Sequence, residues 1–188
     1  MEGLIYIFKN WHSSGFLNNF FKIVTTLGDA GIFWIVLGLV FLSFKKTRIC
    51  GIVMFVSLGI GFVLNDFVLK SIIARPRPFE ANPEFKKFIL SIGMDLPSGF
   101  SMPSGHAYSS FNCATIITLF LKKKGAFSYI IAFLIAFSRI FMCVHYPTDV
   151  LLGAVLGILT ATICYVVYRA VMKKIKFCER EKVRKLNV

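Results

Sequence analysis

The 188-residue sequence predicts an all-α membrane protein, a bundle of five clear transmembrane spans or six, with interfacial amphipathic helices at its N-terminus. Two composition values favour this class: 56% of the residues are hydrophobic, and the mean hydropathy is +0.72, both high for a soluble domain. The third observation is that long apolar runs alternate with short basic tracts. We expect residues 1–188 to form one membrane-embedded domain, divided into an N-terminal region (1–28), a transmembrane core (29–172) and a basic tail (173–188).

The formal net charge of +13 raises the question of nucleic-acid binding. Such binding needs basic residues gathered on one soluble face, whereas here they fall in short tracts between apolar runs. We therefore expect no nucleic-acid partner. Four of the five cysteines lie within apolar stretches and lack the spacing of metal ligands, which argues against a disulfide framework or a zinc site. No metal and no cofactor are expected.

The first 28 residues mix aromatic and aliphatic side chains with polar ones, a poor composition for a lipid-exposed span. We interpret them as one or two amphipathic helices in the membrane interface. A tilted first span is the alternative. His12, beside two serines, is expected to lie in a loop rather than to serve as a ligand.

Apolar runs predict the spans that follow. They cover residues 30–44, 49–73, 104–121, 126–144 and 148–172. The second run has enough residues to cross a hydrocarbon core of roughly 30 Å at about 1.5 Å per residue. Near its end, Asp66 and Lys70 are spaced to share one helix face and are expected to form an ion pair.

Residues 74–103 interrupt the apolar pattern with prolines and mixed charge, and they form the longest predicted loop. Apolar residues at helical spacing predict a short helix over 83–91 within it. The basic tracts at 45–48, at 122–124 and in the tail fall on one side when five spans are counted. The positive-inside rule makes that side cytoplasmic, so the C-terminus is expected in the cytoplasm and the long loop outside.

Three motifs lie where predicted spans meet the outer loops. They are Lys70-x6-Arg77-Pro78, Pro103-Ser104-Gly105-His106 and Ser138-Arg139-x5-His145-x3-Asp149. Ionisable groups at a membrane border are costly and mark functional sites. Any single basic residue could instead extend its charge to the interface, but three of them beside two histidines favour a site.

The residue types suit a phosphate group, which carries about two negative charges near neutral pH. Lys70, Arg77 and Arg139 would supply cationic donors, and the arginines could each grip two oxygens. Ser104 and Gly105 begin the third predicted span, and an exposed helix N-terminus binds anions. Gly105 also permits close backbone approach to a ligand.

His145 has a partner at helical spacing. Asp149 follows four residues later, and Pro147 suits a first helical position, so one turn would bring the carboxylate toward the imidazole. Such a carboxylate fixes the tautomer and leaves the other ring nitrogen nucleophilic.

Two other classes of function are considered for the protein: a catalytically silent lipid-binding protein and a transporter. The intact histidines argue against the former, and the absence of an internal repeat argues against the latter.

In motif order and span layout, residues 24–172 resemble the type 2 phosphatidic acid phosphatase family, whose fold is shared with vanadium haloperoxidases. The resemblance implies a metal-independent membrane lipid phosphatase. It implies that His145 attacks phosphorus to form a phosphohistidine, while His106 protonates the leaving oxygen and then activates water.

The resemblance also bears on the number of spans, the place of Arg75 and the substrate. Family members commonly have six spans, against five clear ones here, and Arg75 is commonly outside the pocket, so we expect it to face lipid headgroups. The expected substrate is a lipid phosphate or diphosphate, with undecaprenyl diphosphate favoured. Phosphatidylglycerol phosphate and phosphatidate are the alternatives, and nothing in the sequence separates them.

Overall fold

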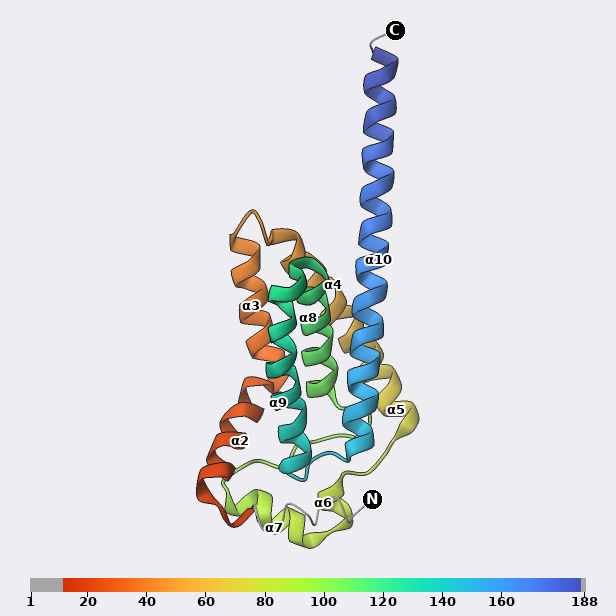
Figure 1. Ribbon diagram of the computed structural model, residues 1–188. Coiled ribbons are helices and arrows are strands. Elements are labelled where there is room, and N and C mark those ends of the chain that lie inside the picture. The colour runs from red at the N-terminus through yellow and green to blue at the C-terminus, as the bar shows by residue number, and fades with distance from the viewer. Residues whose placement is uncertain (1–11, 187–188) are drawn as a thin grey trace.

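The computed structural model describes residues 12–186, with side chains through residue 180, and every regular element in that part of the chain is helical (Figure 1). The elements are α2 (Gly15–Leu27), η2 (Asp29–Gly31), α3 (Ile32–Ser43), α4 (Arg48–Phe62), η3 (Val63–Leu69), α5 (Lys70–Ile73), α6 (Pro78–Ala81), α7 (Pro83–Ser91), α8 (Gly105–Leu121), η4 (Lys122–Phe127), α9 (Ser128–Phe141) and α10 (Pro147–Leu186). The all-α class is confirmed, and the helix predicted over 83–91 is α7. Residues 1–11 of the predicted interfacial region lie outside the described residues.

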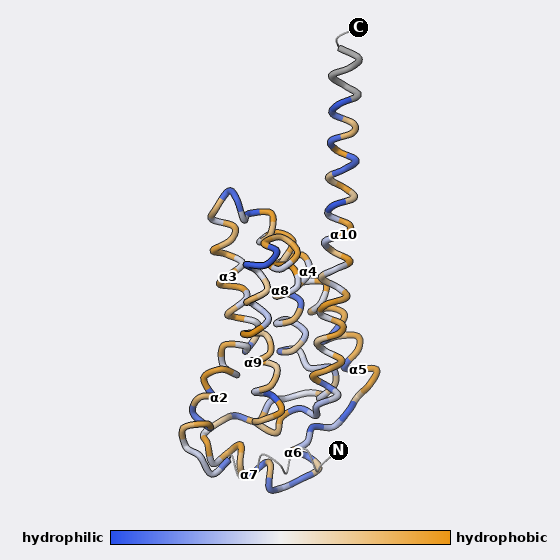
Figure 2. Tube along the Cα trace, in the orientation of Figure 1, coloured by the Kyte–Doolittle hydropathy of each residue, from blue (hydrophilic) through white to orange (hydrophobic). Residues whose placement is uncertain are grey.

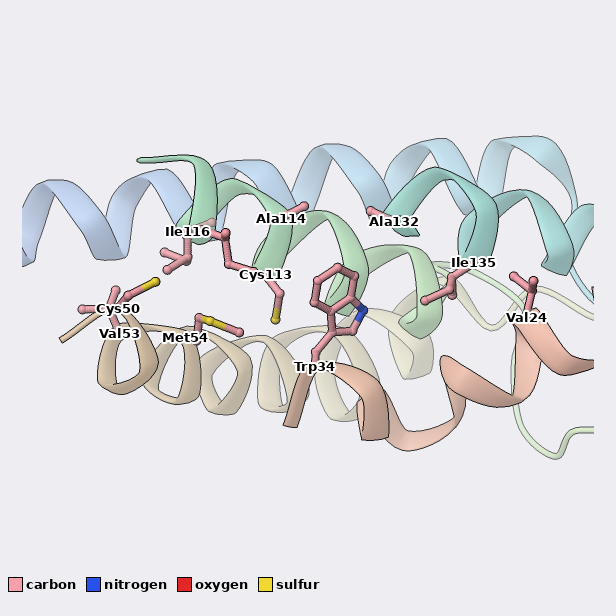
Figure 3. Close-up of a cluster of buried hydrophobic side chains, with 12 residues drawn as sticks. Val24, Trp34, Cys50, Val53, Met54, Cys113, Ala114, Ile116, Ala132 and Ile135 are labelled. Atoms are coloured by element: carbon pink, nitrogen blue, oxygen red, sulfur yellow. The ribbon is translucent and has the colours of Figure 1, made fainter. Parts of the chain in front are cut away.

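Helix α8 lies in the middle of the bundle and packs against α4, α9 and α10 (Figure 1). Its buried residues occur all round its circumference, as expected for a helix that is surrounded by others. Figure 3 shows the largest core cluster, in which Trp34 of α3, Met54 of α4 and Ile135 of α9 are buried around this helix. The indole of Trp34 donates a hydrogen bond to Ser110 Oγ of α8 at 3.0 Å.

The outer faces of the bundle are apolar, as the orange helices of Figure 2 show. Large side chains such as Val36, Phe62, Phe133 and Leu151 are each more than half exposed. Soluble proteins rarely expose such extensive apolar surface. These faces therefore contact lipid, and the chain is a membrane protein.

Three helical stretches are long and apolar enough to cross a membrane, namely Arg48–Ala81, Gly105–Phe141 and Pro147–Arg180. A fourth is reached if Gly15–Leu27 and Asp29–Ser43, which are bent by 48° at their junction, count as one broken span. The predicted count of five is therefore not confirmed. The counts differ because α3 alone has only 12 residues and because α8 and α9 form one stretch through η4, although the chain turns back there in Figure 1.

The last predicted span and the basic tail form a single helix. Helix α10 runs unbroken for 40 residues from Pro147 to Leu186, which corresponds to about 60 Å at 1.5 Å per residue. It continues well beyond the bundle (Figure 1). The boundary predicted after residue 172 is thus a change of composition within one helix.

Two glycines let α10 pack closely against α8. A Cβ at Gly153 would lie 2.5 Å from the carbonyl oxygen of Ser104, and one at Gly157 would lie 2.4 Å from that of Tyr108. Because both obstacles are backbone atoms, Gly153→Ala must push the helices apart, and we expect a loss of roughly 1 to 3 kcal/mol of stability. The measurement is the midpoint of thermal unfolding in detergent.

The matched control is Gly15→Ala, because a Cβ at Gly15 would meet nothing within 4 Å. We expect its unfolding midpoint to equal that of the unmodified protein. Equal midpoints for the two variants would contradict the close packing of α8 and α10 at Gly153.

Candidate active site

A cavity of about 570 Å³ lies where the first turn of α8 meets the end of α9, the α9–α10 connection and the α4–α5 region. Six of the eight predicted site residues line it: Lys70, Arg77, Gly105, His106, Arg139 and His145. The other two, Ser104 and Asp149, are buried behind its wall. The structure therefore brings the three motifs together around one cavity.

His145 lies in the connection between α9 and α10 and is only 2% exposed. The backbone N–H groups of Val144 and His145 both donate to the carbonyl of Arg139, at 3.2 Å each, which fixes the connection against the end of α9. Arg77 Nη1 lies 3.4 Å from His145 Nε2. Since a guanidinium can only donate, this contact makes Nε2 the unprotonated nitrogen.

The protonation state of His145 follows from its surroundings. Burial lowers the pKa of the imidazole below its ordinary value, and the nearby cations Arg139 and Arg77 lower it further, against the opposing effect of Asp149. The imidazole is therefore neutral near pH 7. A neutral ring with an unprotonated Nε2 can act as a nucleophile once the N–H of Arg77 turns away from that nitrogen.

Asp149 approaches His145 as their spacing predicts, but mainly through a third residue. The distance from Asp149 Oδ2 to His145 Nδ1 is 3.7 Å, longer than a hydrogen bond. Ser101 Oγ bridges them, since it donates to Oδ2 at 2.5 Å and lies 3.4 Å from Nδ1. The backbone N–H of Tyr146 also donates to Oδ2, at 2.9 Å. Sequence reasoning missed Ser101, although it lies three residues before Ser104 of the second motif.

The expectation that Arg75 faces lipid headgroups is wrong. Its Nη1 donates to Asp149 Oδ1 and to Thr148 Oγ1, at 2.7 Å each, and its guanidinium lies 4.0 Å from the ring centre of Tyr146. A buried carboxylate attracts a cation strongly enough to hold the arginine inward. One signal was available: Arg75 and Arg77 alternate in an extended segment, so both can point toward the same side.

The two arginines among the predicted site residues, Arg77 and Arg139, differ in how many hydrogen bonds they donate to other residues of the protein. The guanidinium of Arg77 donates to the carbonyl oxygens of Gly99, Ser98 and Val144, at 2.8, 3.0 and 3.2 Å. Arg139 is 4% exposed and donates from Nη1 to Thr25 Oγ1 at 2.5 Å. Its Nε is buried and has no hydrogen-bond partner among the described residues. An unpaired buried donor on a cation is a ready position for an anion.

Lys70 lines the cavity, and Ser104 lies behind its wall. Lys70 forms the predicted ion pair with Asp66, in a π-helical turn at the end of α4. Ser104 precedes the first turn of α8, and its Oγ is buried without a partner among the described residues. A Cβ at Gly105 would meet Asp66 Oδ1 at 3.6 Å, an ordinary contact. The packing of the protein therefore does not require this glycine.

His106 has a carboxylate partner that sequence reasoning did not find. Its Nε2 lies 2.9 Å from Oδ1 of Asp29, which is 77 residues away in the chain. No motif or spacing connects the two residues. The turn between α2 and α3 brings them together.

The remaining walls of the cavity are apolar. They include Ile35 of α3, Phe55, Leu58 and Phe62 of α4, and Tyr108 of α8. One cavity thus offers cations and imidazoles on one side and hydrocarbon on the other. Among residues 12–180, whose side chains the structure describes, no three His, Cys, Asp or Glu side chains are grouped so that they could hold a metal ion.

The chain is similar to known proteins over the region that contains this site. A family model described as the PAP2 superfamily matches residues 47–173. An undecaprenyl-diphosphatase of Sulfolobus acidocaldarius is 32% identical over 150 residues, which cover 79% of this chain and 69% of that protein. All eight predicted site residues fall within the matched region, whereas Asp29 lies before it.

Two solved structures are similar over most of this chain. A transmembrane PAP2-type phosphatidylglycerolphosphate phosphatase from Bacillus subtilis has a TM-score of 0.63 and 28% identity, covering 84% of this chain and 79% of that chain. LpxE of Aquifex aeolicus has a TM-score of 0.64 and 26% identity, covering 81% of this chain and 87% of that chain.

Proposed function

Because the chain belongs to the PAP2 superfamily and is therefore a membrane phosphatase, we propose that it removes the terminal phosphate of a lipid phosphate or diphosphate at the outer membrane interface. The observation that carries this proposal is the cavity, which joins His145 and the cations to an apolar wall. The wall would hold the lipid chain while the cations hold the phosphate. Undecaprenyl diphosphate is the favoured substrate, supported by the relative from Sulfolobus acidocaldarius.

In the proposed reaction, the Nε2 lone pair of His145 attacks the terminal phosphorus. The N–P bond forms as the bond from phosphorus to the leaving lipid oxygen breaks, and His106 donates its proton to that oxygen. In the second step a water molecule attacks the phosphorus and gives a proton to His106. The N–P bond then breaks, which releases phosphate and restores neutral His145.

The cationic side of the cavity supports the charge changes of both steps. The unpaired Nε of Arg139 is placed to bind a phosphate oxygen, and Lys70 adds a second cation. The N–H of Arg77 Nη1 that faces His145 Nε2 would turn to a phosphate oxygen when Nε2 attacks. The first turn of α8, with Ser104 and Gly105, would add backbone donors. Fixed positive groups of this kind stabilise charge that develops on the equatorial oxygens, so the proposed mechanism needs no metal. In this mechanism Asp149 orients His145 through Ser101.

A side-by-side assay of purified protein tests the function. We expect phosphate release without added divalent metal, inhibition by vanadate, and the highest kcat/KM for undecaprenyl diphosphate among that lipid, phosphatidylglycerol phosphate and phosphatidate. A highest value for phosphatidylglycerol phosphate would support the alternative substrate. Complete loss of activity with EDTA, reversed by added metal, would contradict the metal-free mechanism. Absence of release from every lipid would favour a lipid-binding or transport protein.

We propose further that residues 1–188 form one domain in which α4, α8, α9, α10 and the bent α2–α3 pair each cross the membrane, with the C-terminus in the cytoplasm. Two observations support this arrangement. In Figure 1 the chain turns back between α8 and α9, and in Figure 2 the hydrophilic turns after α3 and α8 lie at the end from which α10 continues. The positive-inside rule places such basic turns in the cytoplasm.

Cys178 offers a direct test of this orientation, because it is an exposed free cysteine on the far part of α10. We expect a membrane-impermeant maleimide to label it only after cells are permeabilised. The Cys178→Ser variant gives the background from the other cysteines. In that background, Asp95→Cys in the long loop should be labelled in intact cells. Labelling of Cys178 in intact cells would contradict the orientation.

A further inference from the structure

The segment from Thr25 to Gly31 precedes the region that matches the family, yet it contacts the cavity at several points. Thr25 Oγ1 accepts the hydrogen bond from Arg139. Gly28 and Gly31 line the cavity. Asp29 pairs with His106. We propose that Asp29 is a positioning residue, which holds the His106 imidazole and stabilises its protonated form during proton transfer to the leaving group.

The conformation of the segment explains how Asp29 reaches the histidine. Helix α2 ends at Leu27, and positive φ angles of 49° at Ala30 and 69° at Gly31 bend the chain before α3. Gly28 lies against the imidazole, because a Cβ there would be 2.6 Å from His106 Cδ2 and 2.5 Å from Ile135 Cγ2. The turn therefore contacts the ring at Cδ2 and at Nε2. Only the other nitrogen, Nδ1, remains for proton transfer.

The charges around the cavity explain why His106 needs a carboxylate partner. A general acid must carry a proton, but the His106 side chain is only 17% exposed and shares the cavity with the cations Arg139 and Lys70. Burial and neighbouring cations both disfavour an imidazolium. The carboxylate of Asp66 is already paired with Lys70, and that of Asp149 with Arg75. Among the described residues Asp29 is thus the carboxylate that balances His106.

The Asp29 side chain is 52% exposed, so Asp29→Asn removes a charge with little loss of packing. The isosteric amide can still accept a hydrogen bond from Nε2. Any effect of this variant therefore reports mainly on the charge.

The test rests on the proposed function and uses the rate of the first chemical step, measured as leaving-group release in a single turnover. With phosphatidate, whose leaving group is a basic alkoxide, we expect Asp29→Asn to lower this rate by roughly 10- to 100-fold at an unchanged KM. With p-nitrophenyl phosphate, whose leaving group departs without a proton, the loss should be under about 3-fold. Asp29→Glu should recover much of the rate on phosphatidate.

The matched control is Asp95→Asn, which removes an exposed carboxylate of the long loop and should leave both rates unchanged. In a His106→Ala background, Asp29→Asn should cause no further loss. Equal losses on the two substrates, or losses that multiply in the double variant, would overturn the role of Asp29. Failure of the unmodified protein to release phosphate from these two substrates, from undecaprenyl diphosphate and from phosphatidylglycerol phosphate would instead contradict the proposed function.

Discussion

His145→Ala is expected to lower turnover by on the order of 10⁴-fold or more, as removal of a covalent nucleophile does in other enzymes. The proposed N–P bond to His145 cannot form without its imidazole. Phosphate release from a lipid phosphate measures turnover. Phosphoenzyme is measured with substrate labelled on its terminal phosphate, followed by quenching in alkaline denaturant, and none should form.

The chain offers a matched control, because it contains only three histidines. The third, His12, stacks on Phe88 at 3.7 Å and bonds to the carbonyl of Phe141, away from the cavity. His12→Gln should keep near-normal turnover and form phosphoenzyme. Because His145 is buried, His145→Asn serves as a second variant whose unfolding midpoint is compared with that of the unmodified protein. A folded His145 variant with normal turnover would show that another residue is the nucleophile.

Sequence spacing was most informative where site residues share one helical turn or one helix end. Asp66 and Lys70 form the predicted ion pair because an i,i+4 spacing fixes their relation whatever surrounds them. His145 lies two residues before α10, and Asp149 lies in the first turn of that helix, so their short separation in the chain brings the two side chains within 3.7 Å. Such local geometry depends little on the rest of the fold. The chemical roles of these residues remain proposals.

Spacing could not predict contacts between distant segments. Ser101 and Asp149 are 48 residues apart, and Asp29 and His106 are 77 apart. These pairs depend on how the long loop and the α2–α3 turn fold over the cavity, and neither follows a helical period. The number of spans was uncertain for a related reason, because the bend between α2 and α3 divides an apolar region into two short helices.

The choice between substrates bears directly on His106, because the leaving groups differ. Hydrolysis of a lipid diphosphate expels a lipid phosphate, whose second pKa of about 6 makes it a stable anion near neutral pH. Hydrolysis of phosphatidate or phosphatidylglycerol phosphate expels an alkoxide, which needs a proton as the bond breaks. A general acid is therefore far more important for the monoesters. Both classes still need a base to activate water in the second step.

His106→Ala should separate the two steps of the reaction. With undecaprenyl diphosphate the first step can proceed without an acid, while the second lacks its base, so phosphoenzyme should accumulate on His145 in this variant. With phosphatidate the first step should slow by roughly 10²- to 10⁴-fold, and no phosphoenzyme should accumulate. The measurement is labelled phosphoenzyme against time for both lipids. Accumulation to the same level and at the same rate with both would show that His106 does not protonate the leaving group. Rapid turnover of the diphosphate without accumulation would show that another group activates the water.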